Sequence, residues 1–134
     1  MAKNWSTDAF RRALRKVASA ISKHGHDAID KNAKEFVALA KRLAPVDPEG
    51  GSFLKDTIRE HDTATGGKIV RAGGETTMRE SAGGPYDYSR AQEFGREDMA
   101  PSPYFWPAYR LLKKRFVSRR RRAVAKAIKE SYRS

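Results

Sequence analysis

Three histidines, His24, His26 and His61, are the side chains of this sequence that could most readily bind a metal ion. Structural zinc sites combine Cys and His at short, fixed spacings, often with two ligands one helical turn apart. The chain has no cysteine, and no two of its histidines are four residues apart. We therefore expect ordinary solvated histidines and no bound metal.

Glycine pairs that begin at positions 50, 66, 73 and 83 could in principle cradle a phosphate group. Phosphate-binding loops need Gly-Lys-Ser or Gly-Lys-Thr, and dinucleotide-binding loops need Gly-x-Gly-x-x-Gly, and neither pattern occurs. A serine-centred nucleophile elbow is also missing. The sequence predicts a protein that is not an enzyme and that uses no cofactor.

Four consecutive arginines, Arg119, Arg120, Arg121 and Arg122, form the densest cluster of charge. They fit a solvated helix end, which is what most charge runs are. They equally fit an arm that contacts phosphates or an acidic protein surface. Four adjacent arginines point to every side of a helix, so we expect none in the core and expect this stretch to project beyond it.

The charge is distributed unevenly along the 134 residues, whose net charge is +12. Residues 110–134 contain eleven Lys and Arg but one acidic residue, whereas residues 47–98 contain seven basic and eleven acidic residues. A basic arm therefore follows an acidic middle. This asymmetry fits contact with a nucleic acid backbone, and it also fits subunits that stack a basic face on an acidic face.

The segment from Tyr86 to Pro107 concentrates rigid side chains, with five of the eleven Tyr and Phe, one of the two Trp and three of the six Pro. We expect a short helical stretch that ends at Gly95. Phe94 is expected in the core, and Glu93 is expected to pair with an arginine or to cap a backbone group. Of Phe105 and Trp106, one should be buried and the other should face a neighbouring subunit or a sheet edge.

Helical periodicity predicts one long helix over residues 7–44, capped by Ser6, Thr7 or Asp8 and ended by Pro45 and Pro48. A helix of this length measures about 57 Å, more than a small domain can cover. The alternative is two helices that meet at a turn around Gly25. A final helix should begin near Pro107 and use these apolar positions: Leu111, Leu112, Phe116, Val124 and Ile128.

Between the two helices, short strands are expected near residues 56–64 and 67–72, with a hairpin turn at Gly66 and Gly67. Residues 73–84 have almost no apolar side chain, so we expect a mobile loop that is disordered in the free subunit over 76–83. The fold class is therefore α+β. We expect residues 1–134 to form one domain. In it, a long N-terminal helix and a basic C-terminal helix over residues 110–134 should both pack on a small antiparallel sheet.

The absence of cysteine, of a signal peptide and of an apolar run of about 20 residues favours synthesis in a reducing cytoplasm and no membrane association.

Two motifs resemble the signature of the HK97-type gene-product-ten-like family, which are neck and tail-completion proteins of long-tailed phages. The likeness extends over about residues 6–125, with Ser89 and Arg96 as local departures. The downstream matching positions are Tyr88, Glu93, Phe94, Gly95, Pro101, Pro103, Phe105, Pro107 and Ala108. The upstream matching positions are Ala40, Lys41, Ala44, Pro45, Gly51, Leu54, Lys55 and Ile58.

The resemblance implies a structural protein of the head-to-tail interface, a tail terminator or neck ring of a phage or of a phage-derived particle such as a gene transfer agent. It implies a ring of identical subunits, a hexamer by family precedent. The ring would contact stopper, connector and tail-tube proteins, and contact with DNA in the channel is left open. The alternative function is a free nucleic-acid-binding protein that uses the arginine-rich helix. That alternative explains the charge but not the aromatic segment.

Overall fold

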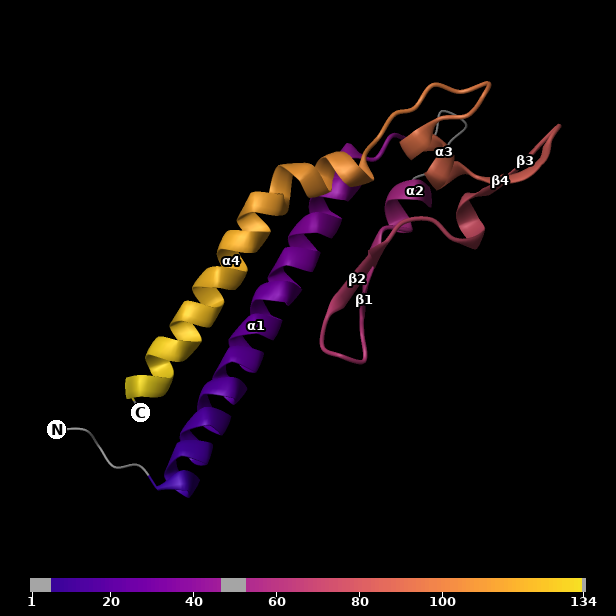
Figure 1. Ribbon diagram of the computed structural model, residues 1–134. Helices are drawn as coiled ribbons and strands as arrows, with labels where there is room; N and C mark the ends of the chain where they lie inside the picture. The colour runs from indigo at the N-terminus through magenta and orange to yellow at the C-terminus, as the bar shows by residue number, and fades with distance from the viewer. Residues whose placement is uncertain (1–5, 47–52, 134) are drawn as a thin grey trace.

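The structure is a computed structural model that describes residues 6–46 and 53–133. Two long helices, α1 (Thr7–Leu43) and α4 (Phe105–Arg133), lie side by side, and a smaller lobe occupies the end where α1 finishes and α4 begins (Figure 1). The lobe contains α2 (Phe53–Asp56), β1 (Arg59–Asp62), β2 (Lys68–Arg71), the 3-10 turn η1 (Glu75–Thr77), β3 (Met78–Ser81), β4 (Gly84–Asp87) and α3 (Tyr88–Phe94). The predicted α+β class is confirmed, although the strands form two separate two-stranded sheets.

Helix α1 is continuous, so the single-helix prediction is confirmed and the alternative with a turn around Gly25 is wrong. The hydroxyl of Ser6 accepts a hydrogen bond of 3.2 Å from the backbone N–H of Ala9, which makes Ser6 the N-cap. At the other end the backbone N–H of Ala44 still donates to Ala40, and Pro45 follows directly. Pro48, Gly50 and Gly51 lie outside the described residues.

Strands β1 and β2 form the expected hairpin, with Glu60 opposite Val70. The turn needs glycine at position 66, where φ is +85°, a conformation that other residues rarely adopt. A side chain there would also collide with the His26 ring on α1. Strand β1 begins later than predicted, because the residues before it form the short helix α2. The ammonium group of Lys68 then ties the hairpin to α1 through an ion pair of 3.2 Å with Asp30.

The second hairpin, β3 with β4, replaces the mobile loop predicted for residues 73–84, so that prediction was wrong. Polar side chains organise this segment. Thr77 is fully buried, and its hydroxyl donates to a carboxylate oxygen of Asp87 at 2.8 Å. The 3-10 turn before β3 is closed by a 3.1 Å hydrogen bond from the backbone N–H of Thr77 to Gly74. Hydrogen bonds to buried groups thus supply the order that apolar side chains do not.

The main core lies at the junction of the lobe and the two helices. Its buried members are Phe36, Ala40, Leu54, Ile58, Tyr88, Tyr104 and Ala108. These residues come from α1, α2, α3, α4 and the segments just after α2 and just before α4, so distant parts of the sequence meet at this junction.

Helix α4 begins at Phe105, two residues before the predicted start, and only part of its expected apolar face packs inward. Leu112 is buried and Phe116 packs against the core, as predicted. The buried residues are Ala108, Leu112 and Ala127, whereas Leu111, Val124 and Ile128 are exposed. Alanine allows the two helices to approach closely. Beyond the last turn of α4, the N-terminal turns of α1 continue as an overhang (Figure 1). Among the described residues, neither this helix nor any other is long and apolar enough to cross a membrane.

Candidate assembly surface

Glu93 holds the start of α4 from a different helix. Its carboxylate accepts backbone hydrogen bonds from Tyr104 at 2.8 Å, Phe105 at 2.9 Å and Trp106 at 2.9 Å. The first N–H groups of a helix have no partner within the helix, and a negative charge there also interacts favourably with the helix dipole. The expectation that Glu93 caps a backbone group is confirmed. One buried carboxylate therefore connects α3 to the first turn of α4 through three hydrogen bonds.

Helix α3, which carries Glu93, is fixed at both ends. Asp87 is its N-cap and accepts from the backbone N–H of Ser89 at 2.9 Å and from the Ser89 hydroxyl at 2.7 Å. Gly95 ends the helix with φ +78°, and a Cβ at this position would lie 2.9 Å from the Cδ atom of Pro101. Two residues of the Glu-Phe-Gly signature therefore have a structural role, because Glu93 caps the start of α4 and Gly95 ends α3.

Tyr104 is the most buried aromatic residue of the segment, with 1% of its surface exposed. Its hydroxyl donates to the backbone oxygen of Ser89 at 3.3 Å. Burial, with a smaller contribution from the charge of Glu93, raises the pKa of the Tyr104 hydroxyl. Sequence reasoning missed Tyr104 as an anchor, since its neighbours Phe105 and Trp106 carry the larger apolar signal.

Phe94, expected in the core, is 64% exposed, so that prediction was wrong. Helix α3 is only two turns long and buries the face that contains Tyr88, Ala91 and Gln92. The Phe94 ring lies on the opposite side, beside a surface hollow that Trp106 also lines. Trp106 is 46% exposed, whereas Phe105 is half-buried. Phe105 is the less exposed of the two, as expected, but neither ring is fully buried, and contact of Trp106 with a neighbouring subunit stays a prediction.

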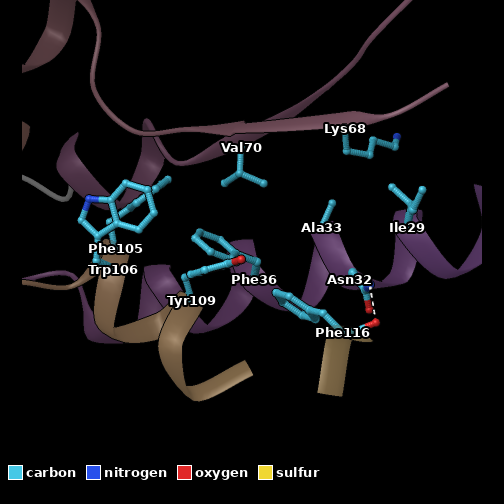
Figure 2. Close-up of a pocket in the computed structure, with 10 residues that line it drawn as sticks. All are labelled: Ile29, Asn32, Ala33, Phe36, Lys68, Val70, Phe105, Trp106, Tyr109 and Phe116. Atoms are coloured by element: carbon cyan, nitrogen blue, oxygen red, sulfur yellow. Dashed lines mark hydrogen bonds between the residues drawn. The ribbon is translucent and has the colours of Figure 1, made fainter. Parts of the chain in front are cut away.

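Aromatic rings from α1 and α4 surround a second hollow of about 270 Å³ beneath strand β2 (Figure 2). The Phe36 ring meets the Phe105 ring edge-on, with 5.0 Å between centroids. Trp106 and Tyr109 form a second edge-on pair at 6.0 Å. The lining contains few polar groups, so the hollow fits an apolar side chain better than a polar ligand.

The remaining signature residues serve the same junction. Leu54 and Tyr88 are buried in the core, and Pro45 follows α1. Pro107 occupies the first turn of α4, where a missing N–H leaves no bond unmade. Pro103 is exposed in the irregular segment before α4, which the backbone N–H of Ser102 fastens to Gln92 at 2.7 Å.

Arg119 belongs to the interface between the helices, so the expectation that all four arginines project from the core was wrong. Its guanidinium forms a 2.8 Å ion pair with Glu35 and donates to the side-chain oxygen of Asn32 at 2.6 Å. Arg115 also pairs with Glu35. Burial alone would raise the pKa of Glu35, but the guanidinium groups of Arg119 and Arg115 outweigh it and lower that pKa.

Arg120, Arg121 and Arg122 are exposed, as predicted. The first two line a shallow groove on the outer face of α4 together with Val117, Val124, Ala125 and Ile128. Arg122 lies on another side, in a polar cleft between α4 and α1 that also contains Lys31 and Lys126.

The histidines do not come together. His24 contacts Glu130 at 2.7 Å across the two helices, His26 lies against the tip of the first hairpin, and His61 is in β1. Within residues 6–46 and 53–133, no group of three or more His, Cys, Asp or Glu side chains could hold a metal ion.

A family model described as "Bacteriophage HK97-gp10, putative tail-component" matches residues 8–95, which is more than half of the chain. No curated protein and no solved structure matches the chain. The matched region includes α1, both hairpins, Glu93 and Gly95.

Proposed function

This chain belongs to the HK97-gp10-like family of bacteriophage tail components, and we propose that it forms a ring at the head-to-tail junction of a tailed phage or of a phage-derived particle such as a gene transfer agent. In this role it is a tail terminator or neck ring without enzymatic activity. It is made in the bacterial cytoplasm and then joins the tail tube to the stopper or connector.

The observation that carries this proposal is the amount of large apolar surface that the subunit leaves uncovered. Phe10 and Leu14 on the α1 overhang are each 53% exposed, and Phe94, Trp106, Val124 and Ile128 are exposed elsewhere. Scattered apolar residues are ordinary on a monomer, but larger patches usually mark interfaces. Phe94 and Trp106 line one hollow, and Val124 and Ile128 line another. The elements that carry these exposed side chains, α3 with the start of α4 and the last turns of α4, lie at opposite ends of the subunit (Figure 1), as expected for a subunit with neighbours on two sides.

Particle assembly tests the proposal directly. A phage or particle that lacks this chain should accumulate filled heads and separate tails, and purified protein added to such an extract should restore joined particles. Tails of abnormal length with this chain absent would favour the terminator role over the neck role. Normal numbers of joined particles in its absence would contradict both roles.

The second candidate, a free nucleic-acid-binding protein, is favoured by the exposed cations of α4. Arg120, Arg121 and Arg122 lie along a helix that also exposes Lys113, Lys126 and Lys129. Binding through phosphates alone weakens steeply as salt rises. A monomer that shifts DNA in a gel at physiological salt would support this candidate, whereas a discrete ring that leaves DNA unshifted would oppose it.

The same arginines separate two mechanisms within the ring proposal. If they contact an acidic protein neighbour, their replacement by Gln reduces joining even with empty heads and purified tails. If they contact channel DNA, the defect is confined to filled heads, and the salt slope of DNA binding decreases.

A further inference from the structure

The outer face of α4 contains a shallow, open groove in which apolar side chains lie beside arginines, all of them from α4 itself. Val117, Arg121, Val124 and Ile128 recur at helical spacing, so they share one face, which lies opposite the face that α4 packs on α1. Arg120 lines the same groove, and no acidic side chain does. The groove is therefore lined by apolar side chains together with two positive charges.

This combination selects a protein partner over DNA. A phosphate backbone needs cations and hydrogen-bond donors, and it offers nothing to cover valine and isoleucine side chains. A protein surface with one large apolar side chain beside carboxylates could cover the apolar side chains of the groove and pair with its arginines.

The lobe of the same chain carries such a surface. Phe94 projects from α3 with most of its ring exposed. Glu97 and Asp98, both exposed, follow on the tight turn that Arg96 and Met99 close through backbone hydrogen bonds. Arg96 lies 3.4 Å from Asp98 and leaves Asp98 largely open to solvent. An exposed apolar side chain, Phe94, is therefore closely followed in the sequence by the carboxylates of Glu97 and Asp98.

We propose that Phe94 of one copy seats in the α4 groove of the next copy, with Glu97 and Asp98 facing Arg120 and Arg121. This inference rests on the proposed ring and names the contact that builds it. Helix α3, which carries Phe94, and the C-terminal half of α4, which carries the groove, lie at opposite ends of the subunit (Figure 1). Such a contact is heterologous, so each copy uses both surfaces, and repetition gives a closed ring or an open filament.

Disulfide trapping tests the pairing, because the chain has no cysteine of its own. Phe94→Cys and Val124→Cys proteins are prepared separately, mixed, and oxidised under mild conditions. The expected result is a covalent dimer in the mixture and little dimer in either protein alone. Ala38→Cys, at an exposed position on α1, replaces Val124→Cys in the control mixture.

The outcomes separate the contact from the ring. A ring seen by native mass spectrometry, with no more Phe94 to Val124 linkage than in the control mixture, overturns this contact and leaves the ring standing. Equal linkage in Phe94→Cys alone also overturns it, because that result indicates a symmetric pair. Linkage to Val124 alone supports it, and a monomer under all conditions overturns the ring and the contact together.

Charge reversal gives a second readout that does not depend on cysteine. Arg120→Glu with Arg121→Glu should raise the dissociation constant between copies at least about tenfold. Addition of Glu97→Lys and Asp98→Lys to that variant should recover most of the loss. Circular dichroism of each variant checks that the fold is intact, and absence of recovery in folded protein overturns the proposed pairing of charges.

Discussion

Glu93 Oε1 accepts a hydrogen bond of 2.9 Å from the backbone N–H of Trp106, thirteen residues later in the chain. The other carboxylate oxygen accepts from Tyr104 and Phe105. Helix α3 thereby fixes the first turn of α4, which presents the exposed Trp106 next to Phe94. Both side chains belong to the surface that we assign to assembly, so the Glu93 carboxylate contributes directly to the geometry of that surface.

Replacement of Glu93 by Ala should lower the free energy of unfolding by about 1.5–3 kcal/mol, because three backbone N–H groups lose a charged acceptor. Urea denaturation of dilute protein measures this change. Glu80→Ala, at an exposed position in β3, is the matched control and should cost less than about 0.5 kcal/mol. Equal costs at the two positions would contradict the capping role of Glu93.

The ion pairs of Glu35 predict a pH dependence of stability. Its pKa is lowered from the ordinary value of 4.5, so its contribution is present above that pH and is lost as the pH falls through the lower pKa of the folded protein. The difference in melting temperature between the native protein and Glu35→Gln should be constant from pH 7 to 6 and shrink below pH 4.5. A difference that grows as the pH falls would have the wrong sign.

The four arginines should separate into one structural residue and three surface residues. Arg119→Gln should cost about 1–2 kcal/mol, since it removes a partly exposed ion pair and leaves Asn32 without its donor. The combined replacement of Arg120, Arg121 and Arg122 by Gln should leave the melting temperature almost unchanged and impair particle joining. If Arg119→Gln proved as mild as Arg120→Gln alone, the interhelical network would not contribute to folding.

Phe105 and Trp106 should respond differently to truncation. Phe105→Ala removes a ring that packs on Phe36, and should cost about 3 kcal/mol, at the lower end of the range for buried Phe. Trp106→Ala removes a more exposed ring, so it should reduce assembly more than it reduces subunit stability. Thermal melting and sedimentation of the two variants measure these effects. If the same variant showed the larger loss in both stability and assembly, the proposed distinction between the two residues would be wrong.

Much of the helical framework could be predicted from sequence, because it depends on local patterns. The apolar spacing of α1 continues on both sides of Gly25, and a side chain at that position would meet nothing within 4 Å, so nothing forces a turn there. The hairpin at Gly66 and the end of α3 at Gly95 follow from the preference of glycine for positive φ.

The predictions that were wrong concern contacts that the pattern of apolar residues along the sequence does not reveal. The second hairpin depends on Thr77 and Asp87, whose hydrogen bonds connect residues ten positions apart. Helix α4 packs through Ala108 and Ala127, so the larger Val124 and Ile128 face outward. Phe94 was predicted to be buried because it is apolar, but α3 already buries its opposite face in the subunit. The errors at Phe94 and at Val124 and Ile128 fall on the surface that we assign to assembly.

The mass of the purified full chain, measured by native mass spectrometry and by sedimentation velocity at physiological salt, tests the central claim most directly. The ring proposal predicts one discrete closed assembly, six copies by family precedent, either alone or on addition of the tail-tube protein. The proposed contact between copies predicts, in addition, that Phe94→Asp, at an exposed position, keeps the subunit folded and dissociates the assembly. A folded monomer at tens of micromolar, with and without the tail-tube protein, would contradict the ring.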